Sequence, residues 1–282
     1  MSSDQAASKE KKERTIPEPP STPGGIIDSH AHVVEEYFSG ETGLIIERAK
    51  SSGVKQMVNP AVTLDGIKEL TEIIDTHDFI YAAAGQHPHE AKHWDKSSGQ
   101  KVEAAMQHAK FVAVGECGLD YHYNNSSREE QLKCFADQIE LAVALNKPVI
   151  VHCRDAWDDA FDLLTRHGQG KVRGVFHCFT GGPEHLEAIA RLDFYVSFSG
   201  IVTYKKAESI QQAAPLVNAN RFLVETDCPF LSPQKVRGLR NEPSFVWWTA
   251  QKLAELRATT IETIGEQASA NARALFCLPN LN

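Results

Sequence analysis

Short apolar runs alternate with longer amphipathic stretches along most of the chain. Eight such runs stand out, at 25–32, 54–60, 80–88, 111–117, 148–153, 174–178, 194–200 and 221–227. Most of them are continuously apolar, as parallel strands that are buried on both faces tend to be. A strand followed by a helix about every 30 residues is typical of repeated β-α-β units.

The stretches between the runs carry helix signals. Ser127 and Glu130 form a capping-box pattern ahead of a helical apolar face, which predicts that a helix starts there. Gly168 stands where a helix from about Asp155 should end, and Pro183 suits the first turn of a further helix.

Eight strand–helix pairs within 282 residues predict a single TIM (β/α)8 barrel over residues 25–282. An open, doubly wound sheet is the alternative, but no G-x-G-x-x-G sequence follows the first run. Residues 1–24 are polar and rich in Ser, Lys, Glu and Pro. They lack the apolar stretch of a secretory signal. Because of their polar composition, we expect them to form a disordered tail.

The first run, GIIDSHAH, ends in three polar residues at alternating positions. Asp28, His30 and His32 would share one face of a strand. Buried polar groups are costly unless a partner satisfies them, and imidazole is a common ligand of transition metals. The pattern therefore indicates a metal site, provided that the rest of the chain supplies further ligands.

Four later runs also end in residues of the types that bind metals. In a barrel the carboxyl ends of all strands meet at one mouth, where barrel active sites are built. The side chains expected to converge there are His30, His32, Glu116, His152, His177 and Asp227. Six ligands exceed the usual number for one zinc ion, so two metal ions are expected. Taken singly, Glu116 could instead cap a helix and Asp227 could form an Asx turn.

A cysteine directly follows four of these ligands. Because adjacent strand residues point to opposite faces, we expect these cysteines to face the helix layer and not the site. They are Cys117, Cys153, Cys178 and Cys228. None of the six cysteines in the chain forms a C-x-x-C pair, which argues against a structural zinc site and suits the reduced thiols of a cytoplasmic protein.

The net charge limits the kind of partner. The chain carries 37 acidic and 29 basic residues, a formal net charge of −8. This balance argues against a protein that coats a duplex, but not against an enzyme that engages one strand end through a metal and a few cations. No stretch is long and apolar enough to span a membrane.

Taken together, these motifs resemble those of the TatD-like metal-dependent deoxyribonucleases of the amidohydrolase superfamily. The matching segments are, in order, DSHAH, GQHPHE, VGECGLDYH, VIVHCRDA, FHCFTGG, VSFSG, LVETDCPFLSP and RGLRNEP, and they cover about residues 25 to 278. The resemblance implies a TIM barrel that hydrolyses phosphodiester bonds of DNA with divalent metals. It implies mainly a 3′-to-5′ exonuclease, acting on single-stranded DNA or DNA 3′ ends, and we expect a monomer.

The same resemblance divides the six ligands between two metals that share Glu116. The first metal would take His30, His32, Glu116 and Asp227, and the second would take Glu116, His152 and His177. Metals lower the pKa of a bound water, and Asp227 would position that water and accept its proton, so Asp227 and Glu116 are the expected catalytic residues. Histidine-rich sites suit Zn²⁺ or Mn²⁺, whereas Mg²⁺ prefers oxygen, so the ion stays open.

Further residues near the expected mouth are candidates for substrate binding. Arg154 could grip a phosphate, with an ion pair to Asp155 or Glu90 as its structural alternative. Loop residues could donate to phosphate or stack on bases, with packing under a loop as their alternative. These residues are His87, His89, Tyr121, His122 and Tyr123.

Two other functions stay open. A metal-dependent amidohydrolase that cleaves a C–N bond or a small ester would use the same barrel, although many such enzymes carry a lysine on strand four where this chain has Glu116. A non-catalytic metal-binding protein is the second alternative, and the intact set of ligands argues against it. The choice between DNA and RNA is also open, because the contacts that sense the 2′-OH cannot be located in the sequence.

Overall fold

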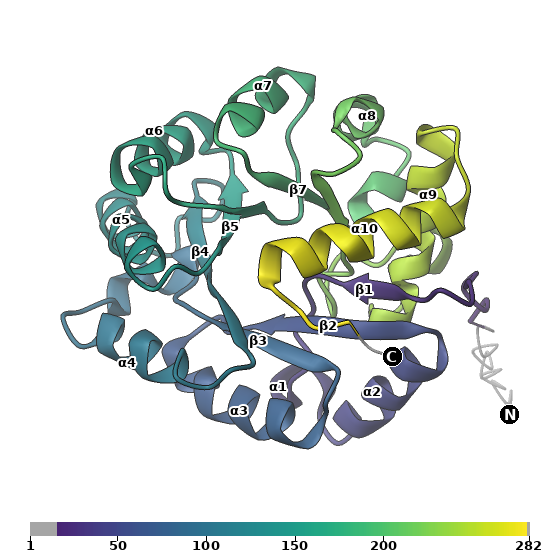
Figure 1. Ribbon diagram of the computed structural model, residues 1–282, viewed down its shortest axis with the longest axis horizontal. Helices are drawn as coiled ribbons and strands as arrows, with labels where there is room; N and C mark the ends of the chain where they lie inside the picture. The colour runs from purple at the N-terminus through teal and green to yellow at the C-terminus, as the bar shows by residue number, and fades with distance from the viewer. Residues whose placement is uncertain (1–15, 281–282) are drawn as a thin grey trace, which may run out of the picture.

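Eight parallel strands form the centre of the molecule, and each strand pairs with the next one along the chain (Figure 1). The computed structural model describes residues 16–280. The strands are β1 Ile26–Asp28, β2 Val54–Pro60, β3 Ile80–Ala84, β4 Phe111–Asp120, β5 Val149–Arg154, β6 Gly174–Phe176, β7 Tyr195–Phe198 and β8 Phe222–Val224. The backbone N–H of Ser29, just after β1, donates to the carbonyl of Val224 at 3.1 Å. The sheet thus nearly closes into the predicted TIM-type (β/α)8 barrel.

Helices follow the strands and cover the outside of the barrel (Figure 1). The α-helices are α1 Glu35–Phe38, α2 Thr42–Ser51, α3 Ile67–Thr76, α4 Ser98–Ala105, α5 Arg128–Ala144, α6 Trp157–Gly168, α7 Pro183–Arg191, α8 Glu208–Ala213, α9 Val246–Leu256 and α10 Ile261–Phe276. Short 3₁₀ segments are η1 Leu64–Gly66, η2 Pro88–His93, η3 Gly200–Thr203, η4 Ala214–Leu216, η5 Gln234–Val236 and η6 Pro243–Phe245.

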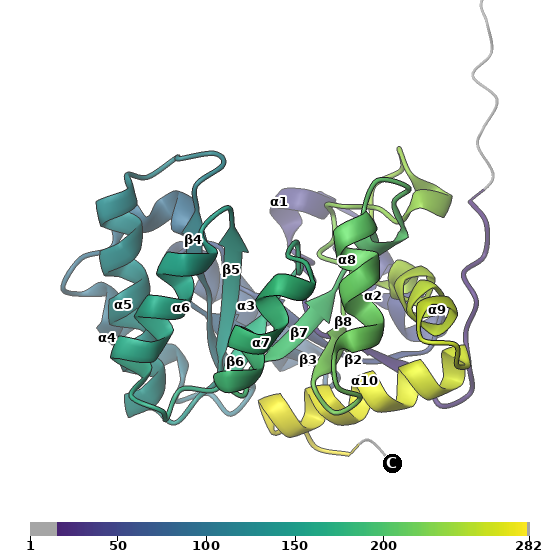
Figure 2. The ribbon, with the colours of Figure 1, turned by 90° about the horizontal axis from the view of Figure 1, so that it is seen from above.

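The strands bury apolar residues on both faces, so two apolar clusters form. In β1, Ile26 joins the larger cluster beneath the helices, and Ile27 joins a second cluster inside the barrel. The inner cluster also takes in Leu275 and Phe276 of α10. Helix α10 crosses the end of the barrel from which the strands start (Figure 2). That end is therefore closed, and a site can form only where the strands end.

All eight predicted strands are present, but five of them, β1, β3, β6, β7 and β8, end earlier than their apolar runs. β1 ends at Asp28, and β8 ends before Asp227. The Asp28 carboxylate accepts hydrogen bonds from the backbone N–H of His30 at 3.3 Å and of Thr226 at 2.9 Å, and so draws both segments out of the ladder. The predicted common strand face of Asp28, His30 and His32 is therefore wrong, because both histidines lie in the loop beyond β1.

The predicted helix signals are confirmed. The Ser127 hydroxyl accepts from the backbone N–H of Glu130 at 3.3 Å, and the Glu130 carboxylate accepts from the backbone N–H of Ser127 at 2.7 Å, which completes a capping box at the start of α5. Pro183 is the first residue of α7, and α6 ends at Gly168. Helix α6 begins later than expected because Asp155 has a φ of +55°, outside the helical region.

Residues 16–24 precede β1 without helix or strand. The rest of the expected disordered tail, residues 1–15, lies outside the described residues, so that prediction and the domain boundary at residue 25 stay predictions. Among the described helices, none combines the length and the apolar character that crossing a bilayer requires.

The capping box gives a stability prediction. Ser127→Ala removes the hydroxyl that satisfies a backbone N–H of α5, and we expect it to lower the free energy of unfolding by about 1 kcal/mol. Urea denaturation followed by circular dichroism measures this loss. Ser127→Thr keeps a hydroxyl and should stay near the wild type, and an equal loss in both variants would contradict the capping role.

Candidate metal centre

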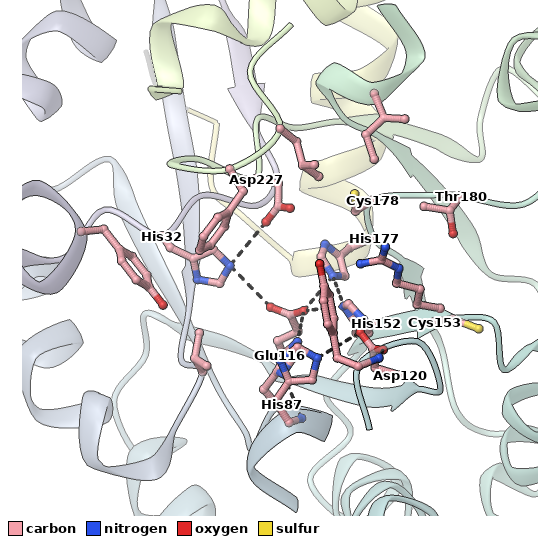
Figure 3. A pocket seen from close by; sticks show the side chains of 18 residues that line it. His32, His87, Glu116, Asp120, His152, Cys153, His177, Cys178, Thr180 and Asp227 are labelled. Carbon is pink, nitrogen blue, oxygen red and sulfur yellow. Dashed lines mark hydrogen bonds and ion pairs between the residues drawn. The ribbon is translucent and has the colours of Figure 1, made fainter. Parts of the chain in front are cut away.

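The six predicted ligands meet at the open end of the barrel, and Figure 3 shows five of them, His32, Glu116, His152, His177 and Asp227. Glu116 is in β4 and His152 is in β5, and the other four stand in the loops just beyond β1, β6 and β8. Among the described residues, groups of His, Asp and Glu in this centre have ligand atoms within 4.8 Å of one another. The barrel thus brings together residues that are up to about 200 positions apart in the chain.

Glu116 lies at the centre and offers one carboxylate oxygen to each of two ligand sets. Its Oε2 atom lies 3.2 Å from Nε2 of His30 and 3.5 Å from Nε2 of His32. Oδ1 of Asp227 lies 3.7 Å and 3.5 Å from the same two nitrogens. We call His30, His32, Asp227 and Oε2 of Glu116 the first ligand set.

The other oxygen of Glu116, Oε1, faces His152 and His177. We call Oε1 of Glu116, His152 and His177 the second ligand set. Oε1 lies 2.8 Å from Nε2 of His177 and 3.2 Å from Nδ1 of His152. The two imidazole nitrogens are 3.4 Å apart. Glu116 is therefore the one member that the two sets share.

These spacings suit bound cations. Four ligands arranged tetrahedrally around Zn²⁺ lie about 3.3 Å from one another. In the first set, the spacings that involve His30 or His32 run from 3.1 to 3.7 Å. The Nε2 atoms of His30 and His32 are 3.1 Å apart and face the same two carboxylates, which leaves room for one proton between them but not for two. A divalent cation would satisfy both nitrogens, so the donor set fits a metal.

The imidazoles of the centre keep its two carboxyl groups ionised although both are buried. Burial would raise the pKa of Glu116, but the imidazoles around it, above all His177 and His87, hold that pKa well below its usual value. Burial also opposes ionisation of Asp227, but a hydrogen bond from His32 and the nearby imidazoles of His30 and His177 together outweigh it and lower the pKa. Both carboxyl groups are therefore ionised at neutral pH, as metal ligands must be.

A fifth imidazole, that of His87, approaches Glu116, with its Nε2 atom 3.3 Å from Oε1. Its Nδ1 atom accepts the backbone N–H of His89 at 3.1 Å, so the neutral ring carries its proton on Nε2 and donates it to Glu116. Burial lowers the pKa of His87 to about 4, which keeps the ring neutral at pH 7. His87 is therefore placed as a hydrogen-bond donor and not as a lone pair for a metal.

Sequence reasoning does not single out Asp120, the last residue of β4. Its side chain is buried, and Oδ2 lies 3.0 Å from Nε2 of His152 and 3.0 Å from Nε2 of His89 (Figure 3). Asp120 follows Glu116 by four positions on one strand, and this spacing is the signal that could have found it.

Other contacts hold the segments that carry the ligands. Strands β4 and β5 come so close that a Cβ atom at Gly118, which has a φ of +134°, would lie 2.0 Å from the carbonyl oxygen of His152. Beyond β8, the side-chain amide of Asn241 donates to the carbonyl of Thr226 at 2.8 Å and to that of Phe230 at 2.6 Å. These two bonds span the turn that carries the first-set aspartate.

Five of the six predicted ligands line a cavity of about 470 Å³, and the sixth, His30, is buried behind them. The guanidinium of Arg154 is also in its wall, 4.8 Å from the centre of the Tyr123 ring. Arg154 has no ion pair with any residue between 16 and 280, because Asp155 and Glu90 approach histidines instead. Tyr123 and Phe230, 57% and 47% exposed, add aromatic surface to the wall.

Of the six predicted substrate residues, four line the cavity, namely Arg154, His87, His89 and Tyr123. The other two turn elsewhere. The Tyr121 hydroxyl donates to the carboxylate of Asp159, and the exposed His122 lies 3.5 Å from Asp155. In this loop the residue in the cavity wall is Tyr123.

The prediction that four cysteines face the helix layer is wrong for one of them. Cys117 and Cys228 are buried in the cluster beneath the helices, and Cys153 belongs to that cluster while also bordering the cavity. Cys178 lines the cavity, with its thiol 3.2 Å from the Ser199 hydroxyl. It lies beyond the end of β6 with a φ of +42°, so strand alternation does not apply to it.

The family described as TatD related DNase matches residues 27–277 of this chain. The uncharacterized metal-dependent hydrolase YabD of Bacillus subtilis (strain 168) is 39% identical over 251 residues, which cover 89% of this chain and 98% of YabD. The 3′-5′ ssDNA/RNA exonuclease TatD of Erwinia billingiae (strain Eb661) is 33% identical over 260 residues, 90% of this chain and 100% of that protein. The crystal structure of YJJV, a TatD homologue from Escherichia coli K12, superposes with a TM-score of 0.83 at 28% identity, covering 90% of this chain and 98% of YJJV.

Barrels that gather imidazoles and carboxylates where their strands end use them to hold metal ions for hydrolysis, and this centre has the same composition. The class is therefore that of metal-dependent hydrolases. Since the match covers nearly the whole described chain, the chain belongs to the TatD-related deoxyribonuclease family.

The protonation of the centre predicts a pH dependence of metal binding. Burial opposes protonation of the imidazoles, but neighbouring carboxylates raise the pKa values of His32, His152 and His177. These rings therefore retain protons at pH values where a free histidine has lost them, and a metal must displace those protons. We expect Zn²⁺ binding at pH 7 to release protons, and its apparent affinity to rise with pH.

Isothermal titration calorimetry in two buffers of different ionisation enthalpy counts the released protons. His177→Gln removes one of the protonated rings and should release fewer. Heats that are identical in both buffers would contradict the expected displacement.

Proposed function

We propose that this metal-dependent hydrolase cleaves phosphodiester bonds of DNA, as a 3′-to-5′ exodeoxyribonuclease that acts on single strands with two divalent cations. The observation that supports this most is Glu116, a buried carboxylate with one oxygen toward each ligand set. A shared carboxylate is suited to a pair of cations held close together, the arrangement that many nucleases and phosphatases use. A relative of similar length carries the name of a 3′-5′ ssDNA/RNA exonuclease.

In the proposed reaction the two ligand sets bind the cations, and Asp227 accepts a proton. The first and second ligand sets would each hold one cation of the Zn²⁺, Mn²⁺ or Mg²⁺ type. Bound cations would lower the pKa of a water molecule and offset the charge that grows on the phosphate in the transition state. Asp227 would accept the proton of the attacking water, because its lowered pKa keeps it ionised at neutral pH.

Two features of the cavity wall favour a nucleic-acid strand as substrate. The guanidinium of Arg154 borders the cavity and lacks a carboxylate partner among the described residues. It is therefore available to bind a phosphate through two parallel hydrogen bonds. The exposed rings of Tyr123 and Phe230 offer surfaces for bases to stack on. His87 would donate its Nε2 proton toward Glu116 or a phosphate oxygen.

The alternative function is hydrolysis of a C–N bond or a small ester by the same centre. The shared barrel is compatible with it, because one fold supports many reactions. The unpaired Arg154 is what favours the nuclease, because a neutral amide substrate would leave this cation without an anionic partner.

The first test is hydrolysis of 5′-end-labelled single-stranded DNA with Mg²⁺ or Mn²⁺. We expect stepwise shortening from the 3′ end, abolished by a chelator. Asp227→Asn removes the proposed proton acceptor and should lower kcat by about 10²–10⁴. Asp193→Asn, an exposed aspartate paired with Arg221, is the matched control and should keep full activity.

A folded, metal-loaded wild type that leaves single-stranded DNA intact would reject the exodeoxyribonuclease. RNA and damaged DNA would then separate the remaining nuclease substrates, and small amides and esters would test the alternative. An Asp227→Asn variant as active as the wild type would reject the proton-acceptor role alone.

A second prediction concerns the phosphate grip. Arg154→Ala removes the cation from the cavity wall and should raise KM for single-stranded DNA about 10-fold to 100-fold, the usual worth of a charged hydrogen bond. Arg154→Lys keeps the charge but not the planar fork, so it should restore the affinity only in part. Arg166→Ala, which removes a surface cation of α6, should leave KM unchanged, and an unchanged KM for Arg154→Ala would contradict the grip.

A further inference from the structure

We infer that Asp120 is a positioning residue that sets the tautomer of His152 and thereby the metal affinity of the second ligand set. The inference rests on the proposed role of His152 as a metal ligand. Asp120 touches neither metal nor substrate in this assignment, and it acts through the ring that it holds.

Four donor atoms converge on the buried side-chain carboxylate of Asp120. Oδ1 accepts the backbone N–H groups of His122 and Tyr123, each at 2.9 Å. Oδ2 lies 3.0 Å from Nε2 of His152 and 3.0 Å from Nε2 of His89. Asp120 is therefore a carboxylate that only accepts.

An acceptor at Nε2 decides where His152 carries its proton. Both ring nitrogens face a carboxylate, Asp120 at 3.0 Å from Nε2 and Glu116 at 3.2 Å from Nδ1. Asp120 is the nearer acceptor, and a cation bound beside Glu116 would need the lone pair of Nδ1, so the neutral ring donates from Nε2 in this assignment. Nδ1 is the atom that faces the centre, 3.2 Å from Oε1 of Glu116 and 3.4 Å from Nε2 of His177. The ring is thus oriented to offer a lone pair and not a proton to a cation.

Among the predicted histidine ligands, His152 has the shortest contact with a carboxylate behind its ring. Within residues 16–280, the Nδ1 atoms of His30 and His32 are buried without a hydrogen bond. Nδ1 of His177 lies 3.4 Å from the Glu225 carboxylate, but its geometry does not make a hydrogen bond. A carboxylate behind an imidazole ligand raises its basicity and fixes its orientation, and the loss of such a partner weakens metal binding by about 10-fold to 100-fold.

If Asp120 only held its loop in place, any variant that loosens this loop would weaken metal binding in the same way. Asp120 also holds the loop that carries His122 and Tyr123, so its loss could act by loosening that loop. Asp159 anchors the same loop by accepting a hydrogen bond from the Tyr121 hydroxyl. It also forms an ion pair with Arg128, and it contacts no histidine among the described residues. Asp159→Asn is therefore the control that loosens the loop and leaves the ligand ring untouched.

The decisive variant is Asp120→Asn. Its amide oxygen can still accept from the loop, but its NH₂ group would face Nε2 of His152, so the ring must move its proton to Nδ1, toward Glu116. In calorimetric titrations with Zn²⁺ and Co²⁺ we expect two binding events in the wild type. In Asp120→Asn one of them should weaken about 10-fold to 100-fold while the other stays near its wild-type value. Asp159→Asn should keep both.

The tautomer itself is measured without metal or activity. Long-range ¹H–¹⁵N NMR of the histidine rings, at a pH above their imidazolium pKa values, reports which nitrogen carries the proton, and His152→Gln identifies the signal. We expect the proton on Nε2 in the wild type and on Nδ1 in Asp120→Asn. If the variant does not fold, the wild-type spectrum still decides, because a proton on Nδ1 there overturns the inference.

The binding data distinguish a failure of the Asp120 inference from a failure of the proposed metal centre. Equal affinities in the wild type and Asp120→Asn, or an equal loss in Asp159→Asn, overturn the role of Asp120 and leave the proposed function standing. A folded wild type that binds no metal overturns the metal centre, and this inference with it.

Discussion

The structure depends on one buried carboxylate, that of Glu116. Five imidazoles surround it at 2.8–3.5 Å, and without positive partners an ion at this depth would cost several kcal/mol. The imidazoles lower its pKa in the absence of a metal, and cations can take over that role when they bind. Because the charge of Glu116 requires this surrounding, the loops beyond β1 and β6 and strand β5 are all fixed around one point.

The barrel makes that arrangement possible. Parallel strands end at the same side, so residues at the ends of β4, β5 and β8 become neighbours although they are far apart in the chain. At the other side, α10 and its apolar residues close the interior (Figure 2). One end of the barrel therefore supplies stability and the other supplies polar groups for a reaction.

Carboxylates behind the ligands form a further layer. Asp28 holds the loop beyond β8 through Thr226, and Asp120 holds the ring of His152. Burial raises the pKa of Asp28 to about 8, in contrast to the lowered pKa of Asp120. The difference follows from their donors, since imidazoles that can carry charge contact Asp120, whereas only neutral hydroxyl and backbone groups contact Asp28.

The sequence by itself determined the order of the strands, the barrel class and the types of residue at the strand ends. These depend on local periodicity and on the rule that parallel strands end together. Only the tertiary structure decided that Asp28 turns away from the histidines, that Tyr123 and not Tyr121 lines the cavity, and that Asp120 stands behind His152. These features arise in loops and from contacts across strands, where a side chain follows its partners in space and not its neighbours in sequence.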